Sequence, residues 1–319
     1  MPNDTPEILV QDMLGIARAA TLLAAGKLVA LPTETVYGLA ADARSDAACA
    51  RIFAAKGRPR FNPLIVHLAS LAQVEALALL PDPARALAAA FWPGPLTMVL
   101  PLRAGHGLSP LVTAGLDTVA VRLPAHPVMR AVLETFGAPI AAPSANPSGR
   151  ISATTLGHVL SGLGGRIDAV LDGADCAVGI ESTILAPAPG GTRLLREGGI
   201  AREDIVVITG PLITDTTPGA ISAPGQMASH YAPAAPVFLN MSLTDRDAVS
   251  IGFGSGAAEF NLSPRGDLPE AAANLFRMLH AADAAAHGRA IHVAPIPDMG
   301  LGRAINDRLQ RAAAPRQPQ

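Results

Sequence analysis

The residues with the clearest chemical potential in this sequence are basic. Of the 24 lysines and arginines only two are lysines, and one of them opens the segment Lys56-Gly57-Arg58-Pro59-Arg60. Charge-assisted hydrogen bonds contribute roughly 1.5–3 kcal/mol each, and one arginine can engage two phosphate oxygens. This concentration of cations predicts a polyanion site. A solvated basic turn is the alternative, because short basic clusters are common on protein surfaces.

Other segments place small polar side chains beside glycine or proline. They are Pro32-Thr33-Glu34-Thr35-Val36-Tyr37-Gly38, Ser144-Ala145-Asn146-Pro147-Ser148-Gly149, and Ser182-Thr183 with Arg196-Glu197-Gly198. Ser144 and Asn146 follow a short apolar run that is typical of a strand. Side chains at the carboxyl end of a strand often face a ligand crevice. A turn-stabilising role for the two residues is equally compatible with their types.

Three single residues add to these candidates. Arg122 interrupts the apolar run Val119–Pro124, where a buried arginine needs a partner. That partner is either a protein carboxylate or the carboxylate of a ligand. His67 ends a predicted strand and is either a hydrogen-bonded core residue or a substrate contact. Glu34 could act as a general base, cap a turn or pair with an arginine, and its role stays open.

With Lys56-x-Arg58 followed far downstream by Ser144-x-Asn146, the chain resembles the threonylcarbamoyl-AMP synthases of the YrdC-like superfamily, in their longer two-domain form. The resemblance spans nearly the whole sequence. It implies that ATP is surrounded by Lys56, Arg58, Asn62, Thr118, Ser144, Asn146, Ser152, Arg196 and Tyr231. It implies that threonine is bound by Thr35, His67, Arg122, Ala142 and Ser182. Lys56 and Arg58 would lie closest to the phosphates, as the catalytic residues.

The reaction implied by this resemblance is the condensation of L-threonine, bicarbonate and ATP to threonylcarbamoyl-AMP and pyrophosphate. The product is used for N6-threonylcarbamoyladenosine in tRNA, by a downstream tRNA threonylcarbamoyl transferase complex. We expect Mg2+ to be held mainly by the ATP phosphates, because the sequence carries no recognisable metal-ligand motif. Protein ligands of the metal and a direct contact with tRNA stay open.

The segment before residue 236 resembles the part of this family that reaches over the active site. It reads Ala223-Pro224-Gly225-Gln226-Met227-Ala228-Ser229-His230-Tyr231-Ala232-Pro233. The resemblance implies that Tyr231 contacts ATP. Many relatives carry basic residues and a further aromatic where this chain has Met227, Ala228 and Ser229. The charge that this segment contributes is therefore open.

Composition limits the other function classes. The net charge of -2 and the pI near 6.4 argue against a chain that wraps nucleic acid by bulk electrostatics. Cys49 and Cys176 are too few for a disulfide framework, and we expect buried thiols. Residues 1–10 lack the pattern of a signal peptide, and prolines interrupt the apolar stretch 86–102. We expect a cytoplasmic protein without a membrane span.

The order of apolar runs predicts an α/β fold: a YrdC-like, twisted, mixed open sheet with flanking helices, followed by a linker and a smaller Rossmann-like α/β domain. We place the catalytic domain at 1–209, a linker reaching over the active site at 210–236, and the small domain at 237–319. Strands are predicted at 28–31, 64–68, 96–100, 118–123, 140–142, 169–171, 182–185, 205–208, 249–252 and 290–293. Helices are predicted at 13–25, 46–55 and 270–285.

Two other functions remain to be weighed. A double-stranded RNA-binding module without adenylate-forming activity would use the basic segment as its contact, although the acidic balance of the chain disfavours it. A carbamoyl transferase resembling the YrdC-like module of hydrogenase-maturation proteins is a further option. Those proteins carry acylphosphatase and zinc-finger regions that this chain lacks.

Overall fold

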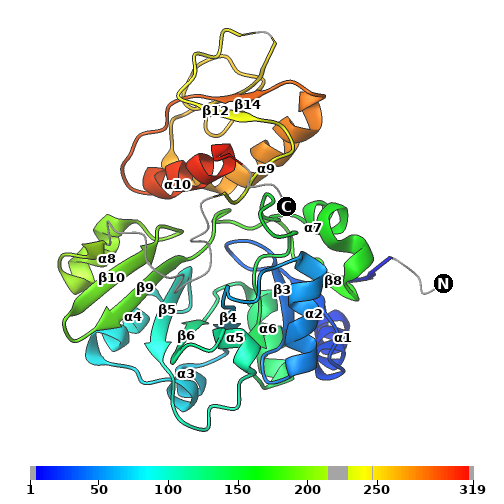
Figure 1. Ribbon diagram of the computed structural model, residues 1–319, viewed down its shortest axis with the longest axis vertical. Coiled ribbons are helices and arrows are strands. Elements are labelled where there is room, and N and C mark those ends of the chain that lie inside the picture. The colour runs from blue at the N-terminus through cyan, green and yellow to red at the C-terminus, as the bar shows by residue number, and fades with distance from the viewer. Residues whose placement is uncertain (1–4, 215–228, 246, 316–319) are drawn as a thin grey trace.

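The computed structural model describes residues 5–214, 229–245 and 247–315. These residues form two units, each built around one sheet (Figure 1). We call residues 5–214 the N-terminal unit, residues 229–236 the connecting segment, and the described residues from 237 onward the C-terminal unit. The predicted boundaries at 209 and 236 stay predictions, and residues 215–228 of the predicted linker lie outside the described residues.

The N-terminal unit holds an 11-stranded sheet of order β1-β8-β2-β3-β7-β4-β6-β5-β9-β10-β11. Parallel and antiparallel pairs alternate in no fixed pattern, so the predicted mixed sheet is confirmed. Its strands are β1 (Glu7–Leu9), β2 (Val29–Leu31), β3 (Gly38–Asp42), β4 (Ile65–His67), β5 (Leu96–Pro101), β6 (Thr118–Arg122), β7 (Ile140–Ala141), β8 (Ala169–Leu171), β9 (Thr183–Ala188), β10 (Gly191–Arg196) and β11 (Ile213–Thr214).

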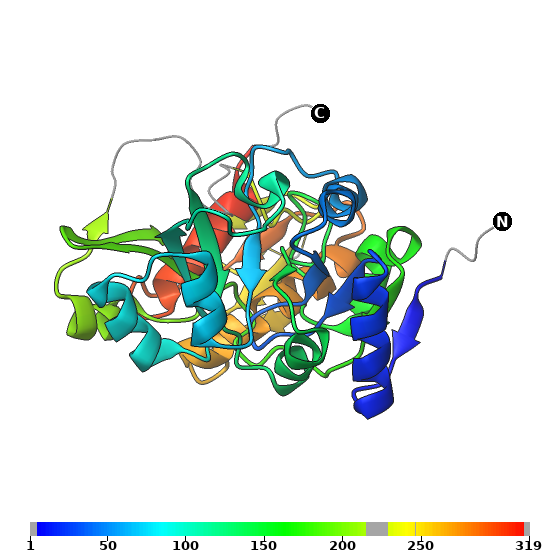
Figure 2. The ribbon, with the colours of Figure 1, turned by 90° about the horizontal axis from the view of Figure 1, so that it is seen from below.

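Helices cover both faces of this sheet (Figure 2). Val29 and Leu31 belong to a core cluster on one face, whereas Leu28 and Ala30 belong to the cluster on the other. Such alternation follows from the two-residue period of a strand, and it explains why β2 and β8 are apolar throughout. One face packs against α1 (Met13–Ala24) and α6 (Pro127–Phe136), and the other against α2 (Asp46–Lys56), α3 (Leu71–Leu77), α4 (Asp82–Phe91), α5 (Pro110–Thr113), α7 (Leu156–Leu163) and α8 (Arg202–Thr209). A short 3-10 turn, η1 (Gly164–Arg166), follows α7.

The basic segment owes its shape to the end of α2. Ser45 begins this helix, and its hydroxyl accepts a hydrogen bond from the Ala48 amide at 3.2 Å. Gly57 ends it in the left-handed conformation, with φ of 61°. Lys56 is therefore the last helical residue, while Arg58 lies beyond the turn. The left-handed turn at Gly57 thus separates the two cations.

The prediction of a strand at 205–208 is wrong, because these residues lie in α8. The β-branched run suggested a strand, but Glu203 and Asp204 precede it in the first helical turn, where acidic side chains favour the helix dipole. Only Ile205 of this run is buried, and Val207 is 82% exposed. Strands β1, β3, β10 and β11 of this unit were not predicted. The alanines of β3 carry no strand propensity, and the strand forms by pairing with β2 and β7.

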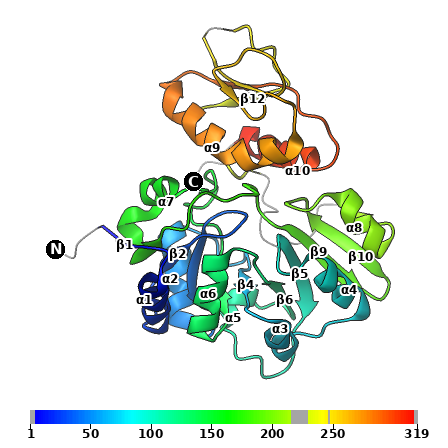
Figure 3. The same ribbon diagram turned by 180° about the vertical axis from the view of Figure 1, so that it is seen from behind.

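The C-terminal unit has a four-stranded parallel sheet of order β12-β15-β13-β14. Its elements are β12 (Val237–Leu239), β13 (Val249–Gly252), β14 (Phe260–Asn261), α9 (Leu268–Ala286), β15 (Ile291–Val293) and α10 (Gly302–Ala313). Helices α9 and α10 lie between the small sheet and the N-terminal unit, as both the front and the rear view show (Figures 1 and 3). The predicted smaller α/β unit is confirmed.

The two units share a hydrophobic core. Val36, Ile151 and Ile180 come from loops of the N-terminal unit, yet their side chains belong to the core cluster of the C-terminal unit. A Cβ atom on Gly179 would lie 2.4 Å from the Cα atom of Ala273 in α9, so the backbones approach closely here. The loops that carry the candidate polar residues are therefore packed from behind by α9.

Two further expectations are tested by the described residues. Cys49 and Cys176 are both free and buried. Among the helices described, none has the length and apolar character needed to cross a membrane.

We expect Ile52→Ala to lower the free energy of unfolding by about 2–5 kcal/mol, because Ile52 of α2 is fully buried in the main core. Exposed Val207→Ala should change it by less than about 0.5 kcal/mol. Urea denaturation followed by circular dichroism measures both. Equal losses in the two variants would contradict this assignment of the core.

Candidate active site

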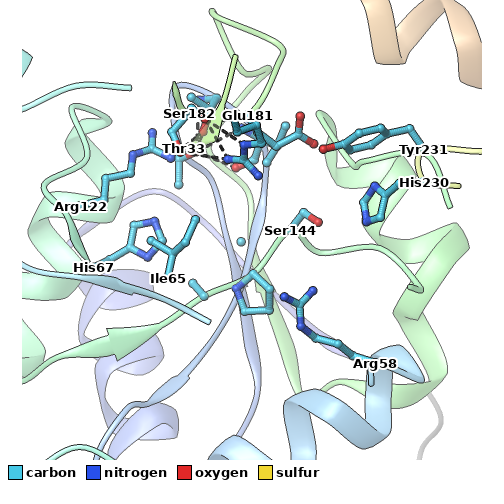
Figure 4. A pocket seen from close by; sticks show the side chains of 16 residues that line it. Thr33, Arg58, Ile65, His67, Arg122, Ser144, Glu181, Ser182, His230 and Tyr231 are labelled. Carbon is cyan, nitrogen blue, oxygen red and sulfur yellow. Dashed lines mark hydrogen bonds between the residues drawn. The ribbon is translucent and has the colours of Figure 1, made fainter. Parts of the chain in front are cut away.

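One cavity of the N-terminal unit collects most of the predicted residues, and it encloses about 570 Å³ of empty space, part of it open to solvent. The lining residues come from the 32–38 segment, the basic segment, β4, β6, the 142–144 turn, the start of β9, the end of β10 and the connecting segment. Arg122 and His67 lie on one side, and Tyr231 and His230 on the opposite side (Figure 4).

Backbone hydrogen bonds fix the central loops of this cavity against each other. The Ala145 amide donates to the Tyr37 carbonyl at 2.7 Å, and the Leu39 amide donates to the Pro143 carbonyl at 2.7 Å. The 32–38 and 143–146 segments therefore run side by side, although they are far apart in sequence. Ser144, which lines the cavity, forms an isolated β-bridge with Gly38.

Lys56 and Arg58 are both buried, at 3% and 9% exposure. The Lys56 ammonium donates to the carbonyls of Ser144 and Asn146, at 2.6 and 2.5 Å. Arg58 donates to the side chain and carbonyl of Asn62 and to the Pro63 carbonyl, at 2.6, 3.2 and 2.8 Å. Among the described residues, no carboxylate forms an ion pair with either cation. Arg58 lines the cavity, whereas Lys56 lies behind the Ser144–Asn146 segment.

The pKa values of these cations reflect their surroundings. Burial lowers the pKa of Lys56 well below its usual value, and the charge of Arg58 lowers it further. Burial, and then the charge of Arg196, lowers the pKa of Arg58 to about 10. Burial is the first cause of both shifts, and among the described residues no ion-paired carboxylate offsets it. An anionic ligand at this end of the cavity would supply negative charge.

Arg196 lies at the end of β10 and also lines the cavity. Its guanidinium donates to the Ser182 carbonyl at 3.1 and 2.9 Å and to the Ser182 hydroxyl at 3.2 Å. The Ser182 hydroxyl also bonds to Thr97 Oγ1 at 2.7 Å. Arg196 and Ser182 were assigned to ATP and to threonine, and the structure places them in contact.

The opposite end of the cavity combines one arginine with hydroxyl groups. Arg122 Nη1 donates to Thr35 Oγ1 at 2.8 Å, and Thr35 Oγ1 bonds to Thr33 Oγ1 at 2.8 Å. Arg122 and His67 are neighbours because β4 and β6 pair in parallel with these residues opposite each other. Ala142 contributes a small apolar surface. A guanidinium with adjacent hydroxyls can bind a hydroxylated amino acid.

Glu34 pairs with Arg122 at 2.7 Å between Oε1 and Nη2. The contact lacks hydrogen-bond directionality, since neither Glu34 oxygen nor Arg122 Nη2 has a directed partner among the described groups. Burial raises the pKa of Glu34, but the lowering causes, of which the positive charge of Arg122 is the largest, outweigh this and leave the pKa lowered. Of the three roles left open for Glu34, the structure favours pairing with an arginine.

Several buried polar atoms around the cavity have no hydrogen-bond partner among the described groups. They are His67 Nδ1, Asn146 Oδ1 and His230 Nδ1. Buried polar atoms are almost always paired, and leaving one unpaired costs about 1–3 kcal/mol. Their grouping around one cavity is the pattern expected when a polar ligand or water completes the site.

The connecting segment closes the cavity from the side of the C-terminal unit. The Ala232 amide donates to the Gly149 carbonyl at 2.9 Å, which fastens this segment to the loop after Asn146. Tyr231 is 1% exposed and has a φ of 61°, a conformation that non-glycine residues rarely adopt. Such outliers concentrate at functional sites. Met227 and Ala228 lie outside the described residues.

Four of the predicted ATP residues, besides Lys56, do not line this cavity. Asn62 supports Arg58, and Asn146 Nδ2 donates to the carbonyls of Pro147 and Arg150 at 2.8 and 2.9 Å. Ser152 donates to Glu181 Oε1 at 2.5 Å. Thr118 begins β6, at the opposite end of the strand from Arg122, so the structure does not bring it to the cavity.

Three residues were missed by sequence reasoning. Thr33 and Glu181 line the cavity, and both lie beside residues that were singled out, so their proximity in sequence was an available signal. Arg308 of α10 contacts Glu181 from behind, with Nε 3.1 Å from Oε2. No sequence pattern distinguishes Arg308 from the other arginines of this helix.

His67→Gln should flatten the dependence of stability on pH. Burial, and then the charge of Arg122, lowers the pKa of His67 to about 3, from 6.5 in the unfolded chain. Between these values the unfolded state binds the extra proton, so wild-type stability falls as the pH falls through this window. Removing His67 should reduce the slope by about 1.4 kcal/mol per pH unit. Urea midpoints from pH 4 to 7 measure it.

The control for this prediction is His287→Asn, because His287 is exposed in the left-handed conformation that asparagine tolerates. This variant should keep the wild-type slope. A His67→Gln slope that matches the wild type would contradict the buried neutral state of His67.

Comparisons with known proteins agree with this geometry. A family model described as Telomere recombination matches residues 21–198, and one described as Threonylcarbamoyl-AMP synthase, C-terminal domain, matches residues 200–314. A Bacillus subtilis (strain 168) protein named Threonylcarbamoyl-AMP synthase is 41% identical over 326 residues, covering 94% of this chain and 93% of the relative. A protein of the same name from Pyrococcus abyssi is 40% identical, covering 92% and 93%.

A solved structure gives the same result. The crystal structure of P. abyssi Sua5 complexed with L-threonine superposes with a TM-score of 0.88 at 38% identity, covering 96% of this chain and 97% of that one. Both units are included in this match. The chain therefore belongs to the threonylcarbamoyl-AMP synthase family, in the form that carries both units.

Proposed function

We propose that this protein is an L-threonylcarbamoyladenylate synthase, a nucleotidyltransferase that condenses L-threonine, bicarbonate and ATP into threonylcarbamoyl-AMP and pyrophosphate. The observation that carries the proposal is one cavity with two chemically different ends. Arg58 lines one end, with Lys56 behind it, and Arg122 with threonine hydroxyls lines the other, while Arg196 lines the cavity where it contacts Ser182. A reaction that joins an amino acid to a nucleotide requires both ends in one space.

The end with Arg122 suits threonine. A guanidinium binds a carboxylate through two parallel hydrogen bonds, and Arg122 is held in place by Glu34 and Thr35. The unpaired His67 Nδ1 is available for a polar group of the substrate, and the hydroxyls of Thr35 and Ser182, which already bond to protein groups, line the same space. The P. abyssi relative, whose structure is described as complexed with L-threonine, supports this assignment.

The cationic end suits the phosphates of ATP. Arg58 presents its guanidinium to the cavity, and the buried charges of Lys56 and Arg196 lie close enough to influence its surroundings. Ser144 and Tyr231 line the same space, and Asn146 offers an unpaired oxygen behind it. Lys56 would act through its charge and by holding the Ser144–Asn146 segment. Placing Thr118 on ATP has no support from its position.

The chemistry needs no covalent enzyme nucleophile. The threonine amine, once it has lost a proton, takes up bicarbonate with loss of water to give a carbamate. A carbamate oxygen then attacks the α-phosphorus of ATP, and the bond to pyrophosphate breaks. The protein contributes by aligning the carbamate with the α-phosphate and by stabilising the charge on pyrophosphate. In this proposal the positive charges of Arg58 and Lys56 stabilise the negative charge on pyrophosphate.

The surroundings of the reaction are also part of the proposal. Among the described residues, no group of three histidine, cysteine or acidic side chains could hold a metal ion. Mg2+ would therefore enter on the ATP phosphates, which matches the preference of this ion for phosphate and water oxygens. A cytoplasmic setting and a downstream tRNA threonylcarbamoyl transferase that consumes the labile product complete the proposed role.

The RNA-binding alternative loses its main support. It depended on an accessible basic segment, but Lys56 and Arg58 are buried, and only Arg60 of its three cations is exposed. A surface that wraps a phosphate backbone needs several accessible cations. No observation in the structure favours this second function over the first.

The test is pyrophosphate release by the purified protein with ATP, Mg2+ and bicarbonate, with and without L-threonine, and with L-serine as the control amino acid. We expect release that depends on threonine. No release under any of these conditions would overturn the proposal. Salt-sensitive binding of double-stranded RNA, measured on the same preparation, would then favour the alternative.

Two variants should distinguish the roles of the two ends of the cavity in substrate binding. Arg58→Met should raise the KM for ATP by about 10- to 100-fold, because charge-assisted hydrogen bonds to phosphate are lost. Arg122→Met should raise the KM for L-threonine by a similar factor. Arg44→Met, which removes an exposed ion pair with Asp42, is the matched control and should resemble the wild type. Equal effects of Arg58→Met and Arg122→Met on both KM values would contradict the assignment.

A further inference from the structure

Arg308 of α10 is the largest side chain that the structure buries completely, and it belongs to the C-terminal unit. Its Nε donates to Glu181 Oε2 at 3.1 Å, and its Nη1 donates to the Glu197 carbonyl at 2.6 Å. Both acceptors lie in the N-terminal unit. Nη1 also contacts Asp307 Oδ2 at 3.0 Å, within α10. One side chain thus joins the two units at the rear wall of the cavity.

Glu181 is the partner that matters for the site, because it lines the cavity beside Ser182 and Arg196. Its two oxygens are used by Ser152, at 2.5 Å, and by Arg308, at 3.1 Å. A carboxylate at this place opposes the binding of a triphosphate unless another charge neutralises it. Arg308 provides that charge from the far side. Removing one partner of a buried pair leaves the other uncompensated.

Tyr231 is held by the same guanidinium. The Arg308 Cζ atom lies 5.6 Å from the centre of the Tyr231 ring, within the range of a cation–π contact. Phe276 of α9 contacts the ring from within the C-terminal unit, with centroids 5.5 Å apart. Because Tyr231 has an unfavourable positive φ, its conformation depends on such contacts. Arg308 therefore supports two residues that line the cavity.

Another ion pair between the units offers a contrast. Arg303, also on α10, pairs with Glu203 of α8 at 2.6 Å, but its Glu203 partner is 53% exposed and neither residue lines the cavity. If α10 served only to attach the units, Arg308 and Arg303 would differ only in how strongly their ion pairs stabilise the contact between the units. Of these two arginines, Arg308 alone contacts residues that line the cavity, namely Glu181 and Tyr231. Tyr231 lies opposite Arg122 and His67 (Figure 4).

We propose that Arg308 is a positioning residue for the nucleotide end of the site: it neutralises Glu181 and fixes Tyr231, so that the C-terminal unit completes the wall of the cavity. This inference rests on the proposed synthase function. It gives the C-terminal unit a direct part in the reaction, beyond covering the apolar side chains of Val36, Ile151 and Ile180.

The test uses the full chain and the threonine-dependent release of pyrophosphate. Arg308→Met should raise the KM for ATP by about 10- to 100-fold, because an unpaired Glu181 repels the phosphates. The KM for L-threonine should change by less than about threefold, since Arg122 lies on the other side of the cavity. Arg308→Lys keeps the charge but cannot reach all its partners at once, so its KM for ATP should be intermediate.

A second substitution distinguishes positioning from mere attachment of the units. Adding Glu181→Gln to Arg308→Met removes the uncompensated charge while its amide oxygen still accepts from Ser152. This double variant should recover most of the lost ATP affinity. Arg303→Met, on the same helix, should keep wild-type kinetics. Thermal denaturation of every variant reports the structural contribution separately.

The outcomes are distinct. A wild-type protein without threonine-dependent release would contradict the proposed function itself. An active wild type with unchanged ATP KM in Arg308→Met would overturn this inference alone, as would equal rises in both KM values without recovery by Glu181→Gln. If Arg308→Met cannot be recovered folded, Arg308→Lys and the double variant carry the same comparison. An ATP KM in Arg308→Lys equal to that of Arg303→Met would then refute the inference.

Discussion

The burial of positive charge beside a ligand cavity is the constraint on which this structure depends. Taking a cation out of water costs several kcal/mol, and the usual solution is a carboxylate partner. Lys56 and Arg58 have no such partner among the described residues, and carbonyl and amide oxygens stabilise them instead. These dipoles offset part of the cost without cancelling the charge. An anionic substrate can neutralise the positive electrostatic potential that remains.

Two other buried arginines, unlike Lys56 and Arg58, each have a carboxylate partner. Arg122 is paired with Glu34, and Arg308 is paired with Glu181. Each pair fixes a side chain in one orientation, because both charges would be costly if separated. The cavity thus contains cations left available at one end and a cation held rigidly at the other. Because Arg308 lies in the C-terminal unit, its pair with Glu181 also connects that unit to the cavity.

The scaffold that positions these groups was largely predictable. Residues 28–31 and 169–171 are continuous apolar runs, and residues 96–100 are apolar except for Thr97, as a strand buried on both faces requires. The secondary-structure predictions failed where the local composition favours one structure and the tertiary contacts impose another. The run 205–208 looks like a strand but is exposed on α8, and the alanines of β3 form a strand only because β2 and β7 offer partners on both edges.

The sequence by itself determined the types of residues that meet in the site and the place of the basic turn, because Gly57 ends α2 immediately after Lys56. Local rules suffice for such features. Only the tertiary structure decided where each side chain lies: Arg58 lines the cavity, Lys56 supports a loop, and Thr118 begins β6 at the end of the strand away from Arg122. It also brought Arg308 to Glu181 across 127 residues. Contacts of that kind depend on how two units pack, which no local pattern encodes.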